Sequence, residues 1–193
     1  ALIREKYGIS KDDVVAIFGG NFGKPQGLDF LLEVLDEYKY AKKLKFILMK
    51  GRQNYICLRR FNDLLAEPDL FDNENQELDL LSDWIKTTET GSRSDLSFLP
   101  SEYLWSRICS ESDACMGMKC KYHSQCFVMK VRKEAADAQI LIVNHHLLFA
   151  DIEARLSGIG FNDTAVLPPY RRLVFDEAHG IENAATSFFS ETL

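Results

Sequence analysis

The chain has 193 residues, of which 46% are hydrophobic and 27% charged, which is enough for one domain or two small ones and excludes wholesale disorder. The net charge of −6 provides no overall basic field for nucleic acid, although a local basic groove remains compatible with it. No apolar run reaches the roughly eighteen residues of a membrane span and no signal peptide is visible, so we expect a cytoplasmic protein.

Short apolar runs at both ends of the chain predict strands of a parallel sheet. The β-branched run at 14–20 ends in glycines and predicts a buried strand, and residues 27–43 carry leucines at helical spacing. Residues 44–51 predict a second strand, which completes a strand–helix–strand unit. Further on, residues 138–149 predict a strand running into a helix, and "RRLVFDEAH" predicts a strand that ends in acids and precedes a helix.

The middle of the chain, residues 52–134, is polar and broken, with helical patches around 58–65 and 78–87. A cysteine cluster follows at 115–126. Strands alternating with helices at both ends of the chain predict the α/β class. We therefore expect a partial parallel sheet that is interrupted by a small, mainly helical module.

The glycine-rich stretch "IFGGNFGKPQG" raises the possibility of a nucleotide-binding P-loop. Such a loop requires G-x-x-x-x-G-K-S/T, but Phe18 takes the place of the first glycine and Pro25 that of the hydroxyl residue, so we reject it. Gly20 and Lys24 remain candidates for contacting a phosphate at the start of the following helix. The alternative is an ordinary strand-to-helix turn with proline at the first helical position.

The acids of "RRLVFDEAH" lie at the carboxyl end of an apolar strand, where parallel sheets bind ligands. In a nucleotide hydrolase Asp176 would hold Mg²⁺ and Glu177 would orient or deprotonate the attacking water. His179 would then connect the state of the nucleotide to the rest of the protein. The alternative is an acidic pair that caps the next helix.

Three cysteines lie close enough in sequence to converge on one metal centre: Cys115, Cys120 and Cys126. The candidates for a fourth ligand are Cys57 and Cys109, with His123 a poorer one. Zinc sites more often show C-x₂₋₄-C pairs, so the residues alone leave an iron–sulfur cluster and an irregular zinc site both open. A third reading is that these are ordinary reduced cysteines.

From residue 44 to the end, the chain resembles DNA helicases of the DinG/XPD type. The segments that carry the resemblance occur in that family's order: "MKGRQNYICLRRF", "SESDACMGMKCKYHSQCF", "AQILIVNHHLLFAD" and "VFDEAHGIENAAT". The resemblance implies an ATP- and Mg²⁺-dependent RecA-like motor domain that unwinds DNA 5′ to 3′ from a single-stranded tail. It also implies an inserted [4Fe–4S] domain held by four cysteines, namely Cys57, Cys115, Cys120 and Cys126. Cys109 falls outside that pattern and would be a structural thiol.

Charged and aromatic residues near the cysteines could contact DNA in such a helicase. The candidate phosphate contacts are Arg59, Arg60, Lys119 and Lys121, and the candidate stacking residues are Tyr55, Tyr122 and Phe127. The alternative is that these aromatic rings pack inside the module. We expect the thiolates to hold together a loop-rich module with little core of its own. Asn144 and His145 match the family, but a capping or packing role suits them equally well.

Residues 4–39 resemble a different family, at the opening of the second domain of bacterial retaining glycosyltransferases. That resemblance would place Gly20 and Lys24 beside the diphosphate of a sugar nucleotide. We therefore expect a chimeric fragment with a seam between Tyr38 and Phe46. Its parts would be a glycosyltransferase-like segment (1–43), a cluster module with its leading strand (44–136) and a partial motor domain (137–193).

We expect no ATP hydrolysis or unwinding by this chain alone, because it has no Walker A loop. Two alternatives remain. The first is a glycosyltransferase-derived protein with an acquired tail, which would bind a sugar nucleotide but not single-stranded DNA. The second is a non-catalytic zinc or redox module, which would contain stoichiometric zinc and no labile sulfide.

Overall fold

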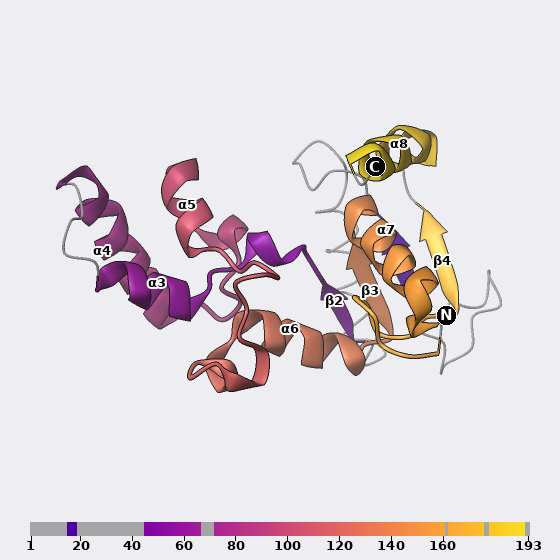
Figure 1. Ribbon diagram of the computed structural model, residues 1–193, viewed down its shortest axis with the longest axis horizontal. Helices are drawn as coiled ribbons and strands as arrows, with labels where there is room; N and C mark the ends of the chain where they lie inside the picture. Colours follow the sequence, from indigo (N-terminus) through magenta and orange to yellow (C-terminus); the bar gives the residue numbers. More distant parts are fainter. Residues whose placement is uncertain (1–14, 19–44, 67–71, 161, 176–177, 192–193) are drawn as a thin grey trace. The chain divides into compact units, whose positions relative to one another are not determined.

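The computed structural model describes residues 15–18, 45–66, 72–160, 162–175 and 178–191 (Figure 1). The chain divides into two compact units, which we call the sheet unit (Ala1–Lys50 with Arg132–Leu193) and the helical unit (Gly51–Val131). The three-part division expected from the sequence concerns family origin and stays a prediction. The helix expected at 27–43 lies outside the described residues. None of the described helices is long and apolar enough to cross a membrane.

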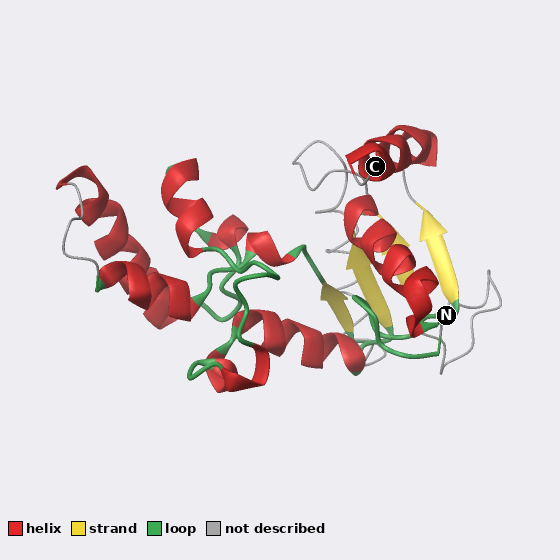
Figure 2. Ribbon diagram, in the orientation of Figure 1, coloured by secondary structure: helices red, strands yellow, loops and turns green. Residues whose placement is uncertain are grey.

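Four strands form the sheet: β1 (Val15–Phe18), β2 (Phe46–Leu48), β3 (Ile140–Val143) and β4 (Arg172–Phe175). Their order is β2-β3-β1-β4, and every neighbouring pair is parallel (Figure 2). Val15 is in register with Ile140 of β3 on one side and with Arg172 of β4 on the other. The expected α/β class with a parallel sheet is confirmed, and the strand nearest the N-terminus folds between strands from the C-terminal part of the chain.

The core of the sheet unit forms where a helix packs against β3. All four residues of β3 are buried, as expected for an apolar parallel strand that is covered on both faces. Leu141 and Val143 share a buried cluster with Leu148 of helix α7 (His145–Ala154). Helix α8 (Ile181–Glu191) contacts α7, and its Phe188 packs against the same cluster.

The helical unit contains short helices joined by turns. Its helices are α3 (Leu58–Leu65), α4 (Asp72–Thr87) and α5 (Glu102–Ile108), with α6 (Phe127–Ala136) crossing the boundary into the sheet unit. Its 3₁₀ turns are η1 (Arg52–Asn54), η2 (Arg93–Asp95), η3 (Gly117–Lys119) and η4 (His123–Gln125). The helical patches expected at 58–65 and 78–87 are confirmed, although the second helix begins earlier than its apolar spacing indicated.

The helical unit has an apolar core of its own, which corrects the expectation that it would have little. The buried residues of that core come from α3, α4, α5 and the segments beside them: Ile56, Phe61, Leu64, Leu78, Leu81, Leu104, Trp105, Ile108 and Cys109. In contrast, no residue between 111 and 126 is buried. The expectation therefore fails for the helices and holds only for this stretch, which we call the cysteine loop.

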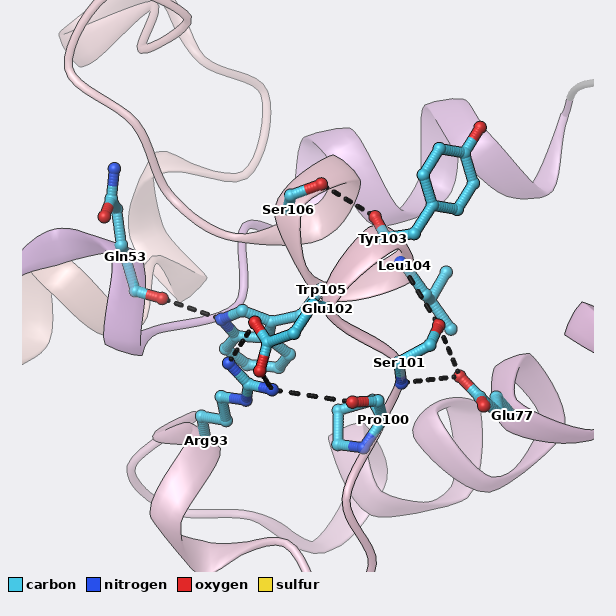
Figure 3. A network of polar contacts seen from close by, with 10 residues as sticks. All are labelled: Gln53, Glu77, Arg93, Pro100, Ser101, Glu102, Tyr103, Leu104, Trp105 and Ser106. Atoms are coloured by element: carbon cyan, nitrogen blue, oxygen red, sulfur yellow. Dashed lines mark hydrogen bonds and ion pairs between the residues drawn. The ribbon is translucent and has the colours of Figure 1, made fainter.

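Trp105 anchors a polar network at the edge of this core (Figure 3). Its indole Nε1 donates a hydrogen bond to the Gln53 carbonyl oxygen at 2.8 Å. The Arg93 guanidinium lies 5.3 Å from the centre of the indole ring and forms two hydrogen bonds with the Glu102 carboxylate, at 2.6 and 3.0 Å. These contacts hold η1, η2 and α5 together although they are separated in sequence.

Ser101 fixes the start of α5 in the same network. Its hydroxyl accepts a hydrogen bond from the Leu104 backbone N–H at 3.3 Å, which satisfies one of the unpaired donors of the first helical turn. The Ser101 hydroxyl and backbone N–H both donate to one oxygen of Glu77 on α4, at 3.2 and 3.1 Å (Figure 3). The cap therefore joins α5 to α4.

Candidate functional site

The four predicted cluster ligands lie at the ends of turns and helices. Cys57 directly precedes α3, Cys120 ends η3 and Cys126 ends η4, and each of the three is half-buried. Cys115 is exposed and lies five residues before Cys120. Turn hydrogen bonds fix the backbone at three of these positions. They run from Cys115 N–H to the Ser112 oxygen at 3.2 Å, from Cys120 N–H to the Gly117 oxygen at 3.1 Å and from Cys126 N–H to the His123 oxygen at 3.3 Å.

Two arginines of α3 tie the start of that helix to the cysteine loop. The Arg59 guanidinium donates to the Ala114 carbonyl oxygen at 2.7 Å, directly before Cys115. The Arg60 guanidinium donates to the Cys109 carbonyl oxygen at 2.9 Å and pairs with Glu111 at 2.7 Å. These contacts bring the chain beside Cys57 to the chain beside Cys115. They give both arginines a structural role, and their predicted contact with DNA stays a prediction.

Within the described part of the chain, no three His, Cys, Asp or Glu side chains converge closely enough to hold a metal ion. No disulfide joins any of the five cysteines, all of which are described. Four cysteines supply thiolate donors of the kind and in the number that an iron–sulfur cluster takes, and they border a loop without buried side chains. In this structure the thiols of these cysteines do not converge as they would around a bound centre.

Cys109 differs from the other four cysteines. It is buried in the core of the helical unit, and its thiol lies 3.7 Å from the Ser106 carbonyl oxygen. Burial, with a smaller contribution from Glu111, raises the pKa of the Cys109 thiol. A buried thiol that holds its proton packs as a small apolar group and is a poor metal ligand.

The candidate DNA-contacting residues on the cysteine loop have different surroundings. Lys119 is exposed, and the Lys121 ammonium lies 5.0 Å from the centre of the Tyr122 ring. Tyr55 is only 3% exposed, so it packs inside the unit and cannot stack on a base without local unfolding. Phe127 is half-buried against the core. Tyr122, with Lys119 and Lys121, therefore remains available for contacts at the surface.

Most of the predicted nucleotide-binding residues lie outside the part of the chain that the structure describes. Gly20, Lys24, Asp176 and Glu177 lie outside the described residues, whereas His179 is exposed in the turn η6 (Ala178–Gly180). The strands that precede these residues in sequence, β1 and β4, do lie in the described part. Their last residues, Phe18 of β1 and Phe175 of β4, are register partners, so these neighbouring parallel strands end at the same edge of the sheet.

Asn144 and His145 take structural roles. The Asn144 side chain caps α7 by accepting a hydrogen bond from the Leu147 backbone N–H at 2.9 Å. His145 is buried, and its ring stacks on Phe149 with the two ring centres 6.3 Å apart. Burial, and then the neighbouring charge of His146, lowers the pKa of His145, so the ring is neutral near pH 7.

Comparison with known proteins agrees with the helicase segments. The chain is 36% identical over 159 residues to the ATP-dependent DNA helicase YoaA of Escherichia coli, and the match covers 79% of this chain and 24% of that protein. It is 34% identical over 151 residues to YoaA of Haemophilus influenzae, covering 77% and 23%. This chain is related to the DinG-type helicases. The ATP-dependent helicase DinG of Mycobacterium tuberculosis is 32% identical over 178 residues, covering 84% of this chain and 25% of that protein. No protein-family model matches.

The chain spans about a quarter of the length of these DinG-type relatives. The match to DinG covers more of the chain than the part from residue 44 onward, so similarity to helicases extends into the segment that we expected to derive from a glycosyltransferase. The glycosyltransferase expectation is not borne out. The position of β1 between β3 and β4 agrees with this correction, because the early strand belongs to the same sheet as the later ones.

Sequence reasoning missed one buried ionic group in this DinG-type chain. Asp151 and Arg155 of the segment that follows β3 pair at 2.6 Å, and both side chains are almost fully buried. A spacing of four residues in a helical pattern was the available signal, but exposed helical pairs show the same spacing. Only the burial of both partners distinguishes this pair from a surface ion pair.

Proposed function

We propose that this chain is a part of an ATP-dependent DNA helicase that carries a [4Fe–4S] cluster on its helical unit. The observation that carries the proposal is the placement of four cysteines at turn and helix ends around the cysteine loop, together with the tie from Arg59 to Ala114. The ligands would be Cys57, Cys115, Cys120 and Cys126. The helicase names of the relatives support this assignment.

The sheet unit is proposed to be part of a RecA-like motor domain. Its parallel strands, with β1 and β4 ending side by side, support this reading because parallel sheets bind ligands at the carboxyl ends of their strands. Asp176 would hold Mg²⁺ and Glu177 would orient the attacking water when ATP is bound, with His179 two residues after Glu177. We propose no turnover by this chain alone, because Phe18 and Pro25 replace the residues that a Walker A loop needs.

The DNA partner is proposed to be single-stranded, or a duplex with a single-stranded tail entered in the 5′-to-3′ direction. Lys119 and Lys121 support this proposal, because they lie exposed on the cysteine loop and such cations bind phosphate oxygens without regard to sequence. Since the chain carries a net charge of −6, binding would depend on this local cluster and not on an overall field.

The test is the iron and acid-labile sulfide content of anaerobically purified protein. We expect about four of each per chain, as a cubane cluster requires. Cys115→Ser should lose both, whereas Cys109→Ser should keep both, because Cys109 is buried in the apolar core. Stoichiometric zinc without sulfide would overturn the cluster and favour the zinc module.

A further inference from the structure

The helical unit contains a cavity beside the cysteine loop. Its volume is about 430 Å³, within the range of small-ligand sites. It opens between α3, the end of α4, the turn η4 and the start of α6. None of the five cysteines, all of which lie in the described part, is among its lining residues. The cavity is not lined by the proposed cluster ligands, although Leu58 directly follows Cys57, and Gln125 and Phe127 flank Cys126.

Apolar side chains form one part of the lining, namely Leu58, Ile85 and Phe127. The Phe127 ring is held in place by Gly91, whose backbone lies against it at a positive φ of 65°. A Cβ added to Gly91 would lie 2.2 Å from the ring, so this close approach requires glycine. The backbone of another segment therefore fixes one aromatic wall of the cavity.

Polar and charged groups form the rest of the lining. Tyr122 and Gln125 come from the cysteine loop, and Gln125 carries both an amide donor and an amide acceptor. The Lys130 ammonium donates to the Glu89 carbonyl oxygen at 2.7 Å, which holds that cation at the cavity. The Lys121 ammonium, 5.0 Å from the centre of the Tyr122 ring, adds a second positive charge nearby.

We propose that this cavity binds one base of an unpaired DNA strand. Aromatic rings suit the flat face of a base, an amide suits its hydrogen-bonding edge, and two ammonium groups suit the flanking phosphates. Among the described residues that line the cavity, Glu89 is the one acidic residue, and a carboxylate there could accept a hydrogen bond from the amino group of adenine, cytosine or guanine. The inference rests on the proposed function for its choice of a DNA strand, and it adds a specific subsite.

The experiment compares two single-stranded oligonucleotides of equal length, one with bases and one with an abasic backbone, by fluorescence anisotropy with the full chain. Loss of one stacked base is expected to weaken binding about 5- to 150-fold. Tyr122→Ala should therefore weaken binding of the base-bearing strand by that factor and leave the abasic strand unchanged. Tyr122→Phe should bind like the original protein, since the ring is retained.

Two further variants separate the subsite from general effects. Tyr103→Ala removes an exposed tyrosine of α5 that does not line the cavity, and it should leave both affinities unchanged. Lys121→Ala should lower the dependence of affinity on salt by about one counterion. Circular dichroism of each variant verifies that the helices are retained.

Several outcomes would overturn the subsite. Equal losses on the two strands, or no loss, in Tyr122→Ala would show that no base occupies the cavity, while the helicase proposal would stand. Competition by a free deoxynucleoside monophosphate as strong as that of the base-bearing strand would reject the strand as occupant. Failure of the original protein to bind either strand would overturn the subsite and the DNA partner together, with the cluster still testable by iron analysis.

Discussion

The two units of this protein each use an arginine–carboxylate pair, but in opposite surroundings. In the sheet unit, Arg155 and Asp151 pair at 2.6 Å with side chains only 1% and 0% exposed. In the helical unit, Arg93 and Glu102 pair at the same 2.6 Å with side chains 22% and 82% exposed. Since water screens the second pair and not the first, equal distances correspond to very different contributions to stability.

The buried pair also closes a loop. Arg155 donates to the carbonyl oxygens of Gly160, Asp163 and Leu167, at 3.2, 2.9 and 2.9 Å. The other oxygen of Asp151 accepts from the Leu167 backbone N–H at 2.7 Å. The two side chains therefore satisfy backbone groups that would otherwise be buried without partners. The sheet unit therefore relies on a polar cluster inside its core, whereas the helical unit places the Arg93–Glu102 pair at the surface.

The largest effect is expected from breaking the buried pair. Arg155→Leu would leave the Asp151 carboxylate buried without its counter-charge, and we expect a loss of about 3–5 kcal/mol from the free energy of unfolding. Hydrogen exchange at residues 141–167, together with urea denaturation, measures this effect. The double variant Arg155→Leu with Asp151→Leu should recover part of the loss. If Arg155→Leu alone were as stable as the original protein, the buried pair would contribute no more to stability than the exposed pair.

The second-largest effect is expected from truncating a core residue of the helical unit, which tests whether that unit has a self-sufficient core. Leu104 is completely buried there, and Leu104→Ala should lower the unfolding free energy of that unit by about 2–5 kcal/mol. Leu99→Ala is the matched control, because Leu99 is 82% exposed and its truncation should change little. Hydrogen exchange should show the loss in the helical unit alone. An equal loss of protection in β3 would mean that the units do not unfold separately.

A smaller, pH-dependent effect is expected in the sheet unit. Burial, and then the Asp151 charge, raises the pKa of Tyr170 to about 12. Because its pKa is higher in the folded state, the hydroxyl stabilises the fold below its unfolded pKa of about 10, and this contribution is lost as the pH rises toward 12. Denaturation midpoints between pH 9 and about pH 12 measure the loss. In Tyr170→Phe the denaturation midpoint should fall less steeply with pH over this range. An unchanged slope in that variant would contradict the assignment of this pH dependence to Tyr170.

The smallest effect is expected at the exposed pair. A hydrogen bond from Arg93, and then its charge, lowers the pKa of Glu102. The stabilisation is therefore present above the unfolded pKa of a glutamate and is lost as the pH falls through the lower folded value. Glu102→Gln should be slightly less stable than the original protein at pH 7, and the two should converge in acid. If Glu102→Gln lowered the free energy of unfolding as much as Arg155→Leu does, the two pairs would not differ in their contribution to stability.

Much of the architecture was predictable because it depends on local patterns. Continuous apolar runs indicated β1, β2 and β3, and the spacing of leucines indicated α3 and part of α4. Cys109, which falls outside the cysteine pattern of the resembled family, is buried. In contrast, Tyr55 carries the same aromatic ring as Tyr122 but is buried, because an isolated bridge to Ser92 places it inside the unit.

The sequence by itself determined the class of fold, the density of cysteines in one loop and the segments that resemble helicases. Only the tertiary structure decided the strand order β2-β3-β1-β4, the structural role of Arg59 and Arg60, and the burial of Asp151 with Arg155. Local patterns depend on residues a few positions apart, whereas each of these features also depends on contacts with other segments of the chain. The register of Phe18 with Phe175 is the clearest case, since no periodicity in either segment encodes its partner.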